Sequence, residues 1–264
     1  MELEGNSRVD ILLERKSCSE EALKSCAPFG VGRVVSSRPK DLASSNGGLV
    51  LVRIAGSEGS EIAVKKTDCI PIPDDLDIRL AIWIPALAFA LWIWEKLSLE
   101  LGDVAVYSGG TPFSELVGQV ALRRGGCPVI RLGNHVSEDL NPGTETLSLQ
   151  DPVFAVEKLK QRIAGKTGFA AVDLSGLPEI IDVILEALPR WGRVMLLGFE
   201  SRPVTIDFYK NVHYKGAVIL SGVFDPSLVF AKDPELVAQL PRAIRILRNG
   251  STAQPLLASL GCNF

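Results

Sequence analysis

The sequence predicts an α/β protein whose main part is a doubly wound parallel sheet, preceded by a smaller β-rich region. From residue 102 onward, short apolar runs alternate with amphipathic helical stretches, which is typical of a parallel sheet. The stretch Gly102–Gly133 has the pattern of a strand, a glycine turn, a helix and a second strand. Between residues 30 and 65, short β-rich runs alternate with Gly, Ser and Asn turns, which favours a small barrel or sheet.

Composition and charge argue against several classes of function. The 264 residues carry a net charge of −3 and show no Lys/Arg stripe, so we expect no binding to nucleic acid. The polar N-terminus predicts no secretory leader. The apolar run Ile82–Trp94 is broken by Pro85 and is shorter than the roughly 20 residues that span a membrane. Five cysteines without paired spacing indicate reduced thiols, and we therefore expect a cytoplasmic protein that does not bind membranes.

The first 100 residues are expected to form mainly strands. Val9–Leu13 predicts a strand, and Ser19–Lys24 predicts a short helix capped by Ser19. The elements expected next are strands at Gly30–Ser37, Gly48–Ile54 and Glu61–Lys65, a proline-stiffened exit at Ile70–Asp75, and a helix over most of Leu76–Leu97.

The glycine turn after the strand Val104–Tyr107 is typical of a phosphate-binding turn. A helix follows this turn, and the N–H groups and dipole at a helix N-terminus favour a phosphate. In the G-x-G-x-x-G register only Gly109 keeps its glycine, with Gly110 beside it, because Thr111 and Ser114 occupy the other two places. Both replacements are small, so the pattern leaves open a nucleotide site and a plain structural turn.

The second strand of this unit, Val129–Leu132, is not followed by the acidic residue that usually binds an adenine ribose. Gly133, Asn134 and His135 stand at that place. The missing acid favours a phosphorylated cofactor, and Arg131 together with Asn134 and His135 is the expected contact of its 2′-phosphate.

The remaining strands and helices alternate toward the C-terminus. The strands are expected at Thr144–Leu149, Phe169–Leu174, Arg193–Gly198 and Gly216–Val223, and the helices at Pro152–Ala164, Pro178–Leu188 and Leu236–Arg248. Right-handed crossovers bring the carboxyl ends of such strands to one edge, where ligands bind at the switch point. The strand ends expected to converge there are Ser108–Thr111, Gly133–His135, Ser175-Gly176 and Gly198–Glu200.

The order of these segments resembles the medium-chain dehydrogenase/reductase family, the zinc-alcohol-dehydrogenase-like superfamily. The stretches that carry the resemblance are GVGRVV with GLVLVRI and SEIAV, then IPIPDDLDIRLA, LELGDVAVYSGGTPFSELVGQVALRRGG and AAVDLSGLPEIIDVILEALPRWGRVMLLGFESRPVTIDF. The resemblance implies a reduced GroES-like β-barrel with a hinge helix in residues 1–96 and a Rossmann-type nucleotide-binding domain in residues 97–225. It implies a C-terminal helix and tail in residues 226–264 that return toward the β domain, and a homodimer through the strand at 216–223.

The departures from that family concern its metal sites. The family usually has a longer N-terminal section with a Gly-His-Glu motif and metal ligands, whereas no histidine here precedes His135. The family's four-cysteine zinc loop is missing as well, and Cys18, Cys26 and Cys69 lack the close spacing of a tetrahedral zinc site. We therefore expect no zinc and a member whose substrate domain is trimmed at both ends.

The resemblance implies a zinc-independent NAD(P)(H)-dependent oxidoreductase that acts on a small or medium carbonyl or alkene substrate in biosynthesis, with NADP slightly favoured over NAD. The expected catalytic residues are Tyr107, at the end of the first strand, and Glu115, in the first helical turn, where the dipole favours a carboxylate. For Tyr107 the alternative interpretation is a packed strand residue. The expected cofactor-binding residues are Ser108, Gly109, Gly110, Thr111, Pro112, Phe113, Arg131, Gly133, Asn134, His135, Ser175, Gly176, Gly198 and Phe199.

A second interpretation follows from the same departures. Thr111, Ser114, Glu115 and the missing ribose acid favour a remodelled member without redox chemistry. Such a protein would be a cyclase- or lyase-type enzyme or a non-catalytic partner subunit.

Overall fold

The structure, a computed structural model, describes residues 8–13, 29–38, 48–53, 61–65, 68–133, 143–166, 168–198, 203–222, 233–250 and 253. The chain divides into two compact units, one formed by residues 1–89 with 225–264 and the other by residues 90–224. No helix within the described ranges is long and apolar enough to cross a membrane.

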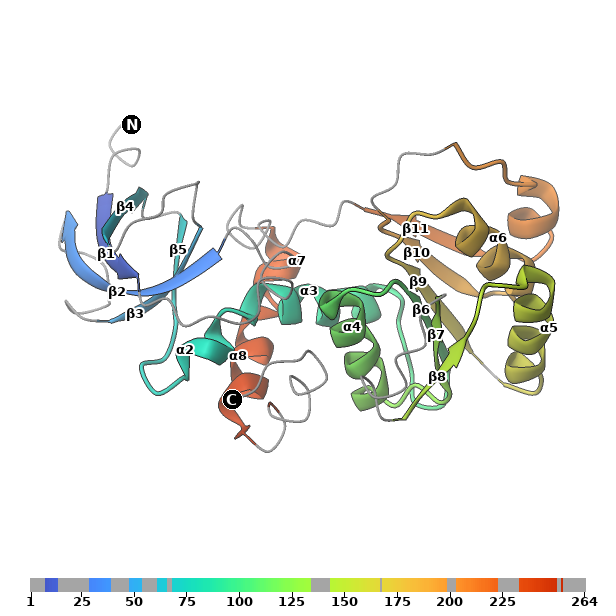
Figure 1. Cartoon of the computed structure of the whole chain (residues 1–264), viewed down its shortest axis with the longest axis horizontal. Helices are drawn as coiled ribbons and strands as arrows, with labels where there is room; N and C mark the ends of the chain where they lie inside the picture. The colour runs from blue at the N-terminus through green and yellow to red at the C-terminus, as the bar shows by residue number, and fades with distance from the viewer. Residues whose placement is uncertain are drawn as a thin grey trace. The chain divides into compact units, whose positions relative to one another are not determined.

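The first unit contains a five-stranded antiparallel sheet with the strand order β4-β1-β2-β3-β5 (Figure 1). Its strands are β1 (Arg8–Leu13), β2 (Phe29–Arg38), β3 (Leu49–Arg53), β4 (Glu61–Lys65) and β5 (Cys69–Pro71). The β-rich region expected from the sequence is confirmed, and its first four strands agree with the prediction to within one residue at each end. The predicted helix Ser19–Lys24 lies outside the described residues.

The strand β5 was not expected from the sequence, because Ile70–Asp75 predicted only a proline-stiffened exit. In the structure Val52 pairs with Cys69 and Val50 pairs with Pro71. The strand order places β5 at an edge of the sheet, where a proline costs little because its missing N–H need not serve a ladder on the outer side.

Prolines interrupt two segments that were predicted as single helices. The segment Leu76–Leu97 forms α2 (Ile78–Ala81) and α3 (Ile84–Lys96), and the C-terminal segment forms α7 (Pro234–Val237) and α8 (Leu240–Arg248). Pro85 and Pro241 stand in the first turn of α3 and α8, respectively. A proline has no N–H for the carbonyl one turn earlier and is tolerated only at a helix start, so each divides the predicted helix.

The second unit is built on a six-stranded parallel sheet with the order β11-β10-β9-β6-β7-β8. Its strands are β6 (Val104–Ser108), β7 (Val129–Leu132), β8 (Thr144–Leu147), β9 (Phe169–Asp173), β10 (Arg193–Leu196) and β11 (Val218–Ser221). Numbered from one to six along the chain, these strands have the order 3-2-1-4-5-6 across the sheet, which is the order of dinucleotide-binding sheets. The predicted doubly wound parallel sheet is thereby confirmed.

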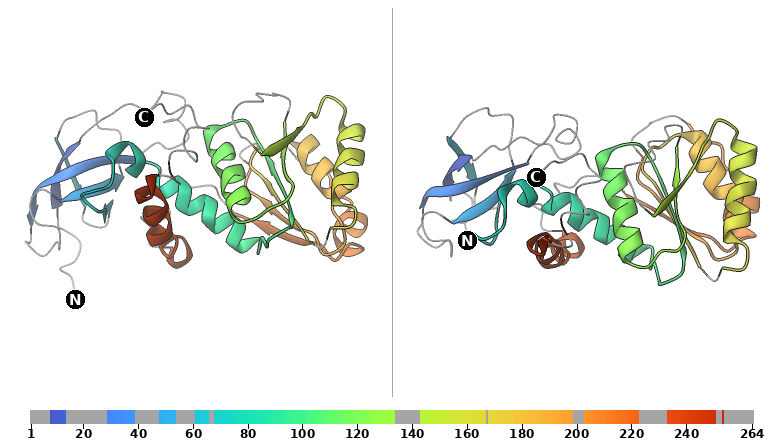
Figure 2. Two further views of the ribbon diagram at one scale, coloured as in Figure 1. Left: turned by 90° about the horizontal axis from the view of Figure 1, so that it is seen from below. Right: turned by 60° about the horizontal axis from the view of Figure 1, so that its bottom comes forward.

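Helices cover both faces of this sheet (Figures 1 and 2). α5 (Pro152–Ile163) and α6 (Pro178–Ala187) pack side by side on one face, in a core that includes Val104 and Val106 of β6. α4 (Pro112–Arg123) covers the opposite face. Successive residues of a strand point to opposite faces, so β6 serves both layers. A five-residue π-helix, η2 (Tyr209–His213), precedes the edge strand β11.

Candidate functional site

The site predicted by the strand order lies where β6 and β9 end side by side. Ser108, the last residue of β6, is fully buried and donates a hydrogen bond from Oγ to Oδ1 of Asp173, the last residue of β9, at 2.6 Å. The same Ser108 Oγ accepts the N–H of Leu174 at 2.9 Å. These bonds join the two strand ends at the switch point, where ligands of such sheets bind.

Asp173 also organises the loop that follows β9. Its fully buried carboxylate accepts the N–H groups of Ser175 at 3.1 Å and Gly176 at 2.9 Å, and the Ser175 hydroxyl at 2.7 Å. The end of β10 lies so close to this loop that a Cβ atom on Gly198 would be 1.9 Å from the backbone nitrogen of Gly176. The structure therefore brings together four predicted residues, Ser108, Ser175, Gly176 and Gly198, around an aspartate that was absent from the predicted set.

The loop after β6 has the backbone geometry that a phosphate-binding turn needs. Gly109 has φ of +111°, in the region that favours glycine. A Cβ atom on Gly110 would meet no atom within 4 Å, and Gly110 and Thr111 are exposed. Gly133 lies beside this turn, because a Cβ atom there would be 3.8 Å from the Gly109 carbonyl oxygen. A ligand can therefore approach the backbone at Gly110, and which of the two interpretations of the turn holds stays a prediction.

The N-terminus of α4 is closed by its own side chains. Thr111 Oγ1 accepts the N–H of Ser114 at 3.2 Å, and Ser114 Oγ accepts the N–H of Thr111 at 3.0 Å. Ser114 Oγ donates in turn to the Thr111 carbonyl at 2.7 Å. This is a reciprocal capping box, and Pro112 between the two residues has no N–H at all. Donors that a helix start usually offers to an anion are therefore engaged internally or missing at these three positions.

Tyr107, Glu115 and Arg131 form a buried polar cluster behind the turn. Glu115 Oε2 accepts the Tyr107 hydroxyl at 3.0 Å, and Glu115 Oε1 accepts Arg131 Nη1 at 2.7 Å. The side chains of Arg131 and Glu115 are 5% and 3% exposed, and Tyr107 is fully buried. The ion pair cancels the negative charge that Glu115 would otherwise bring to the start of α4.

This burial bears on the roles expected for three residues. Tyr107 and Glu115 are buried and hydrogen-bonded to each other, a geometry that favours a structural role for both, and their catalytic role stays a prediction. The guanidinium of Arg131 is bound to Glu115 and lies in the interior, so it is not presented to a cofactor 2′-phosphate.

The other predicted residues are placed as follows. Pro112 and Phe113 begin α4, and Phe113 is buried. Asn134, His135 and Phe199 lie outside the described residues. Within the described ranges no three His, Cys, Asp or Glu side chains come close enough to hold a metal ion, and the absence of zinc stays a prediction.

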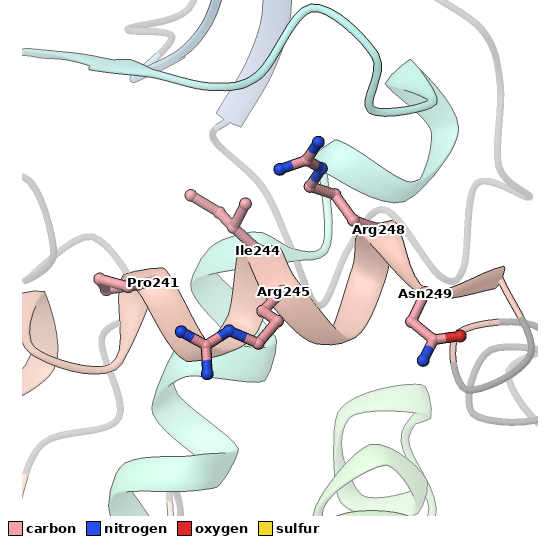
Figure 3. A pocket seen from close by; sticks show the side chains of 5 residues that line it. All are labelled: Pro241, Ile244, Arg245, Arg248 and Asn249. Atoms are coloured by element: carbon pink, nitrogen blue, oxygen red, sulfur yellow. The ribbon is translucent and has the colours of Figure 1, made fainter.

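An open pocket of about 590 Å³ lies along α8 in the first unit. Figure 3 shows its lining residues, Pro241, Ile244, Arg245, Arg248 and Asn249. The side chains of Arg245 and Arg248 extend in different directions, and Arg248 is bound to Asp75 at 2.5 Å. Because the two guanidinium groups do not converge, the switch point of the second unit remains the better candidate for an anionic ligand.

Sequence comparison identifies two characterised dehydrogenases as relatives, although no protein-family model matches the chain. The chain is 24% identical over 161 residues to (R,R)-butanediol dehydrogenase of Neisseria gonorrhoeae. The aligned residues cover 60% of this chain and 44% of that protein. It is 26% identical over 200 residues to L-threonine 3-dehydrogenase of Rhizobium rhizogenes. This alignment covers 69% of this chain and 55% of that protein. The aligned region thus spans about half the length of these relatives.

Solved structures with the same architecture are also dehydrogenases. Galactitol-1-phosphate dehydrogenase from Escherichia coli superposes with a TM-score of 0.73 at 13% identity, covering 94% of this chain and 83% of that one. 2R,3R-butanediol dehydrogenase from Bacillus subtilis superposes with a TM-score of 0.70 at 15% identity, covering 96% and 88%. At these identities the likeness establishes the fold, which is the fold that the sequence resemblance implied.

Proposed function

We propose that this chain, which has the fold of the medium-chain dehydrogenase/reductases and matches dehydrogenases of that superfamily in sequence, is an oxidoreductase that binds a nicotinamide dinucleotide. One observation carries the proposal: the 3-2-1-4-5-6 strand order places the positive-φ turn at Gly109 on the switch point of the sheet. The curated relatives are named for butanediol and L-threonine, two small hydroxy compounds whose oxidation gives carbonyls, which supports a small or medium carbonyl substrate. An alkene substrate and a biosynthetic role belong to the proposal without such support.

The residues at the switch point fit such a cofactor. Gly109 and Gly110 let a diphosphate approach the backbone, while Gly198 lets the end of β10 pack closely against the loop after β9. A nicotinamide dinucleotide bound there would supply or accept the hydride. The chain's own part is to hold and orient it, with Asp173 fixing the loop after β9. Tyr107 and Glu115 support the turn from behind.

We further propose that this oxidoreductase works without zinc. The support is the sequence: no histidine precedes His135, and Cys18, Cys26 and Cys69 lack the close spacing of a tetrahedral zinc site.

The capping box of Thr111 and Ser114 favours a second candidate function. If the two side chains keep the start of α4 closed, the crevice holds no dinucleotide, and the chain is a cyclase- or lyase-type enzyme or a non-catalytic partner subunit. Function has to be argued from the site rather than the fold, and the two candidates differ in whether a dinucleotide binds.

Calorimetric titration of the purified chain with NADH and NADPH separates these candidates. We expect micromolar binding of at least one cofactor, together with a rise in the melting temperature, since a ligand that binds only the folded state stabilises it. We expect NADPH to bind more tightly, because Gly133 and the two residues after it supply no acid for a ribose 2′-hydroxyl. Absence of binding at millimolar concentration of both would reject the oxidoreductase and leave the second candidate.

We also propose that the chain pairs with a second copy through β11. This strand pairs with β10 and lies at the end of the strand order, with Val218 47% exposed. An exposed apolar edge strand invites pairing, and two copies related by a two-fold axis can extend the sheet across it. The residues that would form the contact are Val218–Ser221.

Changing Val218 to aspartate is expected to convert this dimer into monomers, because each copy would bring a charge into an apolar strand-to-strand contact. Val218 is a better position than Ile219, whose side chain packs on the core of the second unit. Light scattering coupled to gel filtration measures the mass against the 28.5 kDa of one chain. Val153→Asp, at a 70% exposed position on α5, is the matched control and should leave the mass unchanged. A Val218→Asp variant that remains dimeric contradicts the proposal.

A further inference from the structure

We propose that the hydroxyl of Thr111 occupies the place of a phosphate oxygen at the start of α4, and that Thr111 thereby limits how tightly the chain binds a dinucleotide. The inference rests on the proposed function, because it concerns the same turn. It assigns to Thr111 a role in setting cofactor affinity.

Most backbone N–H groups at the start of α4 are already bonded or missing. The positions whose N–H groups have no partner within a helix are the N-cap and the first three helical residues. Three of these four positions offer no free N–H: the N-cap Thr111 gives its N–H to Ser114 Oγ, Pro112 has none, and Ser114 gives its N–H to Thr111 Oγ1. The fourth position is Phe113. A phosphate oxygen that seeks the Ser114 N–H must therefore displace the Thr111 hydroxyl.

Of the two capping side chains, Thr111 is the one that can rotate to admit a ligand. Ser114 is fully buried, its hydroxyl is bound to both the N–H and the carbonyl of Thr111, and Gly109 packs against it. A Cβ atom on Gly109 would lie 3.1 Å from Ser114 Cβ, so Ser114 has little room. Thr111 is exposed, and its bond to Ser114 is the longest of the three at 3.2 Å. Rotation of the Thr111 side chain is thus the smallest change that frees an N–H for a ligand.

Three variants of Thr111 test this, with ADP and NADPH as calorimetric probes. Thr111→Gly removes the hydroxyl and the bulk, and we expect both probes to bind roughly fivefold more tightly, the equivalent of one capping bond. Thr111→Val keeps the bulk without the acceptor, and we expect a smaller gain. Thr111→Ser keeps the cap, and we expect the affinity of the unchanged chain. Asp151→Gly removes a comparable cap from α5, whose Phe154 N–H it accepts at 3.0 Å, and controls for lost helix stability.

A spectroscopic readout shows where the probe binds. In a ¹⁵N-labelled chain, ADP is expected to shift the amide signal of Ser114, and to shift it at lower ADP concentration in Thr111→Gly. The amide of Phe154, which is capped in the same way by Asp151, is expected to stay in place.

The outcomes separate this inference from the function on which it rests. Tighter binding by Thr111→Gly than by Thr111→Ser supports the inference, and it does so even if the unchanged chain binds neither probe, in which case the oxidoreductase itself is rejected. Micromolar binding by the unchanged chain with no gain in Thr111→Gly overturns the inference and leaves the oxidoreductase standing. Absence of binding by every variant overturns both the inference and the oxidoreductase, because removal of the Thr111 cap then creates no binding site.

Discussion

Replacing Arg131 with methionine is expected to lower the free energy of unfolding by about 3–5 kcal/mol, because it leaves the Glu115 carboxylate buried without its partner charge. The hydroxyl of Tyr107 remains as a neighbour of that carboxylate, but a neutral hydroxyl does not compensate a full charge in the interior. Urea denaturation followed by circular dichroism measures the change.

Two further variants test the cause of this loss. Arg123→Met lies on the same βαβ unit, where the exposed Arg123 bonds to the neutral Gln119 and not to a buried charge, and we expect a loss of about 1 kcal/mol. The double variant Glu115→Leu with Arg131→Met removes both charges and should recover part of the lost stability, since apolar replacements of a buried pair are often tolerated. If Arg131→Met were as stable as the unchanged chain, the buried ion pair described here would not exist in solution.

Replacing Gly198 with alanine is expected to cost about 3 kcal/mol or to prevent folding of the second unit. The added Cβ atom would lie 1.9 Å from the nitrogen and 2.1 Å from the Cα atom of Gly176. These are backbone atoms, so the strain cannot be relieved by rotating a side chain, and it falls at the upper end of overpacking costs. The Asp173 hydrogen bond to the Gly176 N–H would be displaced with the loop.

Gly110→Ala is the matched control for this substitution. It makes the same chemical change in the turn after β6, where a Cβ atom would meet nothing within 4 Å. We expect its melting temperature to stay near that of the unchanged chain in a thermal denaturation scan. Equal melting temperatures for Gly198→Ala and Gly110→Ala would show that β10 does not approach the loop after β9 as closely as described.

The sheet could be predicted from the sequence because each strand and helix carries its own local signal. The strands alternate with helices of ordinary length, and the turn at Gly109 stands between them in the expected register. The loop after β9 was also within reach, because Asp173 and Ser175 form an Asx-type turn that an Asp-x-Ser sequence favours. Asp173 itself was missed because no local pattern shows that Ser108 meets it across the sheet.

The buried cluster was beyond sequence reasoning for a related reason. Tyr107 and Arg131 stand opposite each other in the register of β6 and β7, and that register is a property of the folded sheet. Polar residues at a strand end and in a first helical turn resemble exposed site residues in sequence. Only their pairing shows that Glu115 faces the interior. The capping box could be recognised as a sequence pattern. That it engages the N–H groups at the start of α4 became clear only from the distances between Thr111 and Ser114.

The bond between Ser108 and Asp173 has a consequence for how this protein folds. The two residues are separated by 65 positions in the chain, and their contact forms only after β9 has paired with β6. Closing so long a loop is entropically costly, so contacts of this kind stabilise the chain only late in folding. The glycine motif alone therefore does not specify the crevice: a nascent chain that ends before β9 carries the whole motif and still has no site. A dinucleotide site of the kind proposed would therefore be complete only when the sheet is complete.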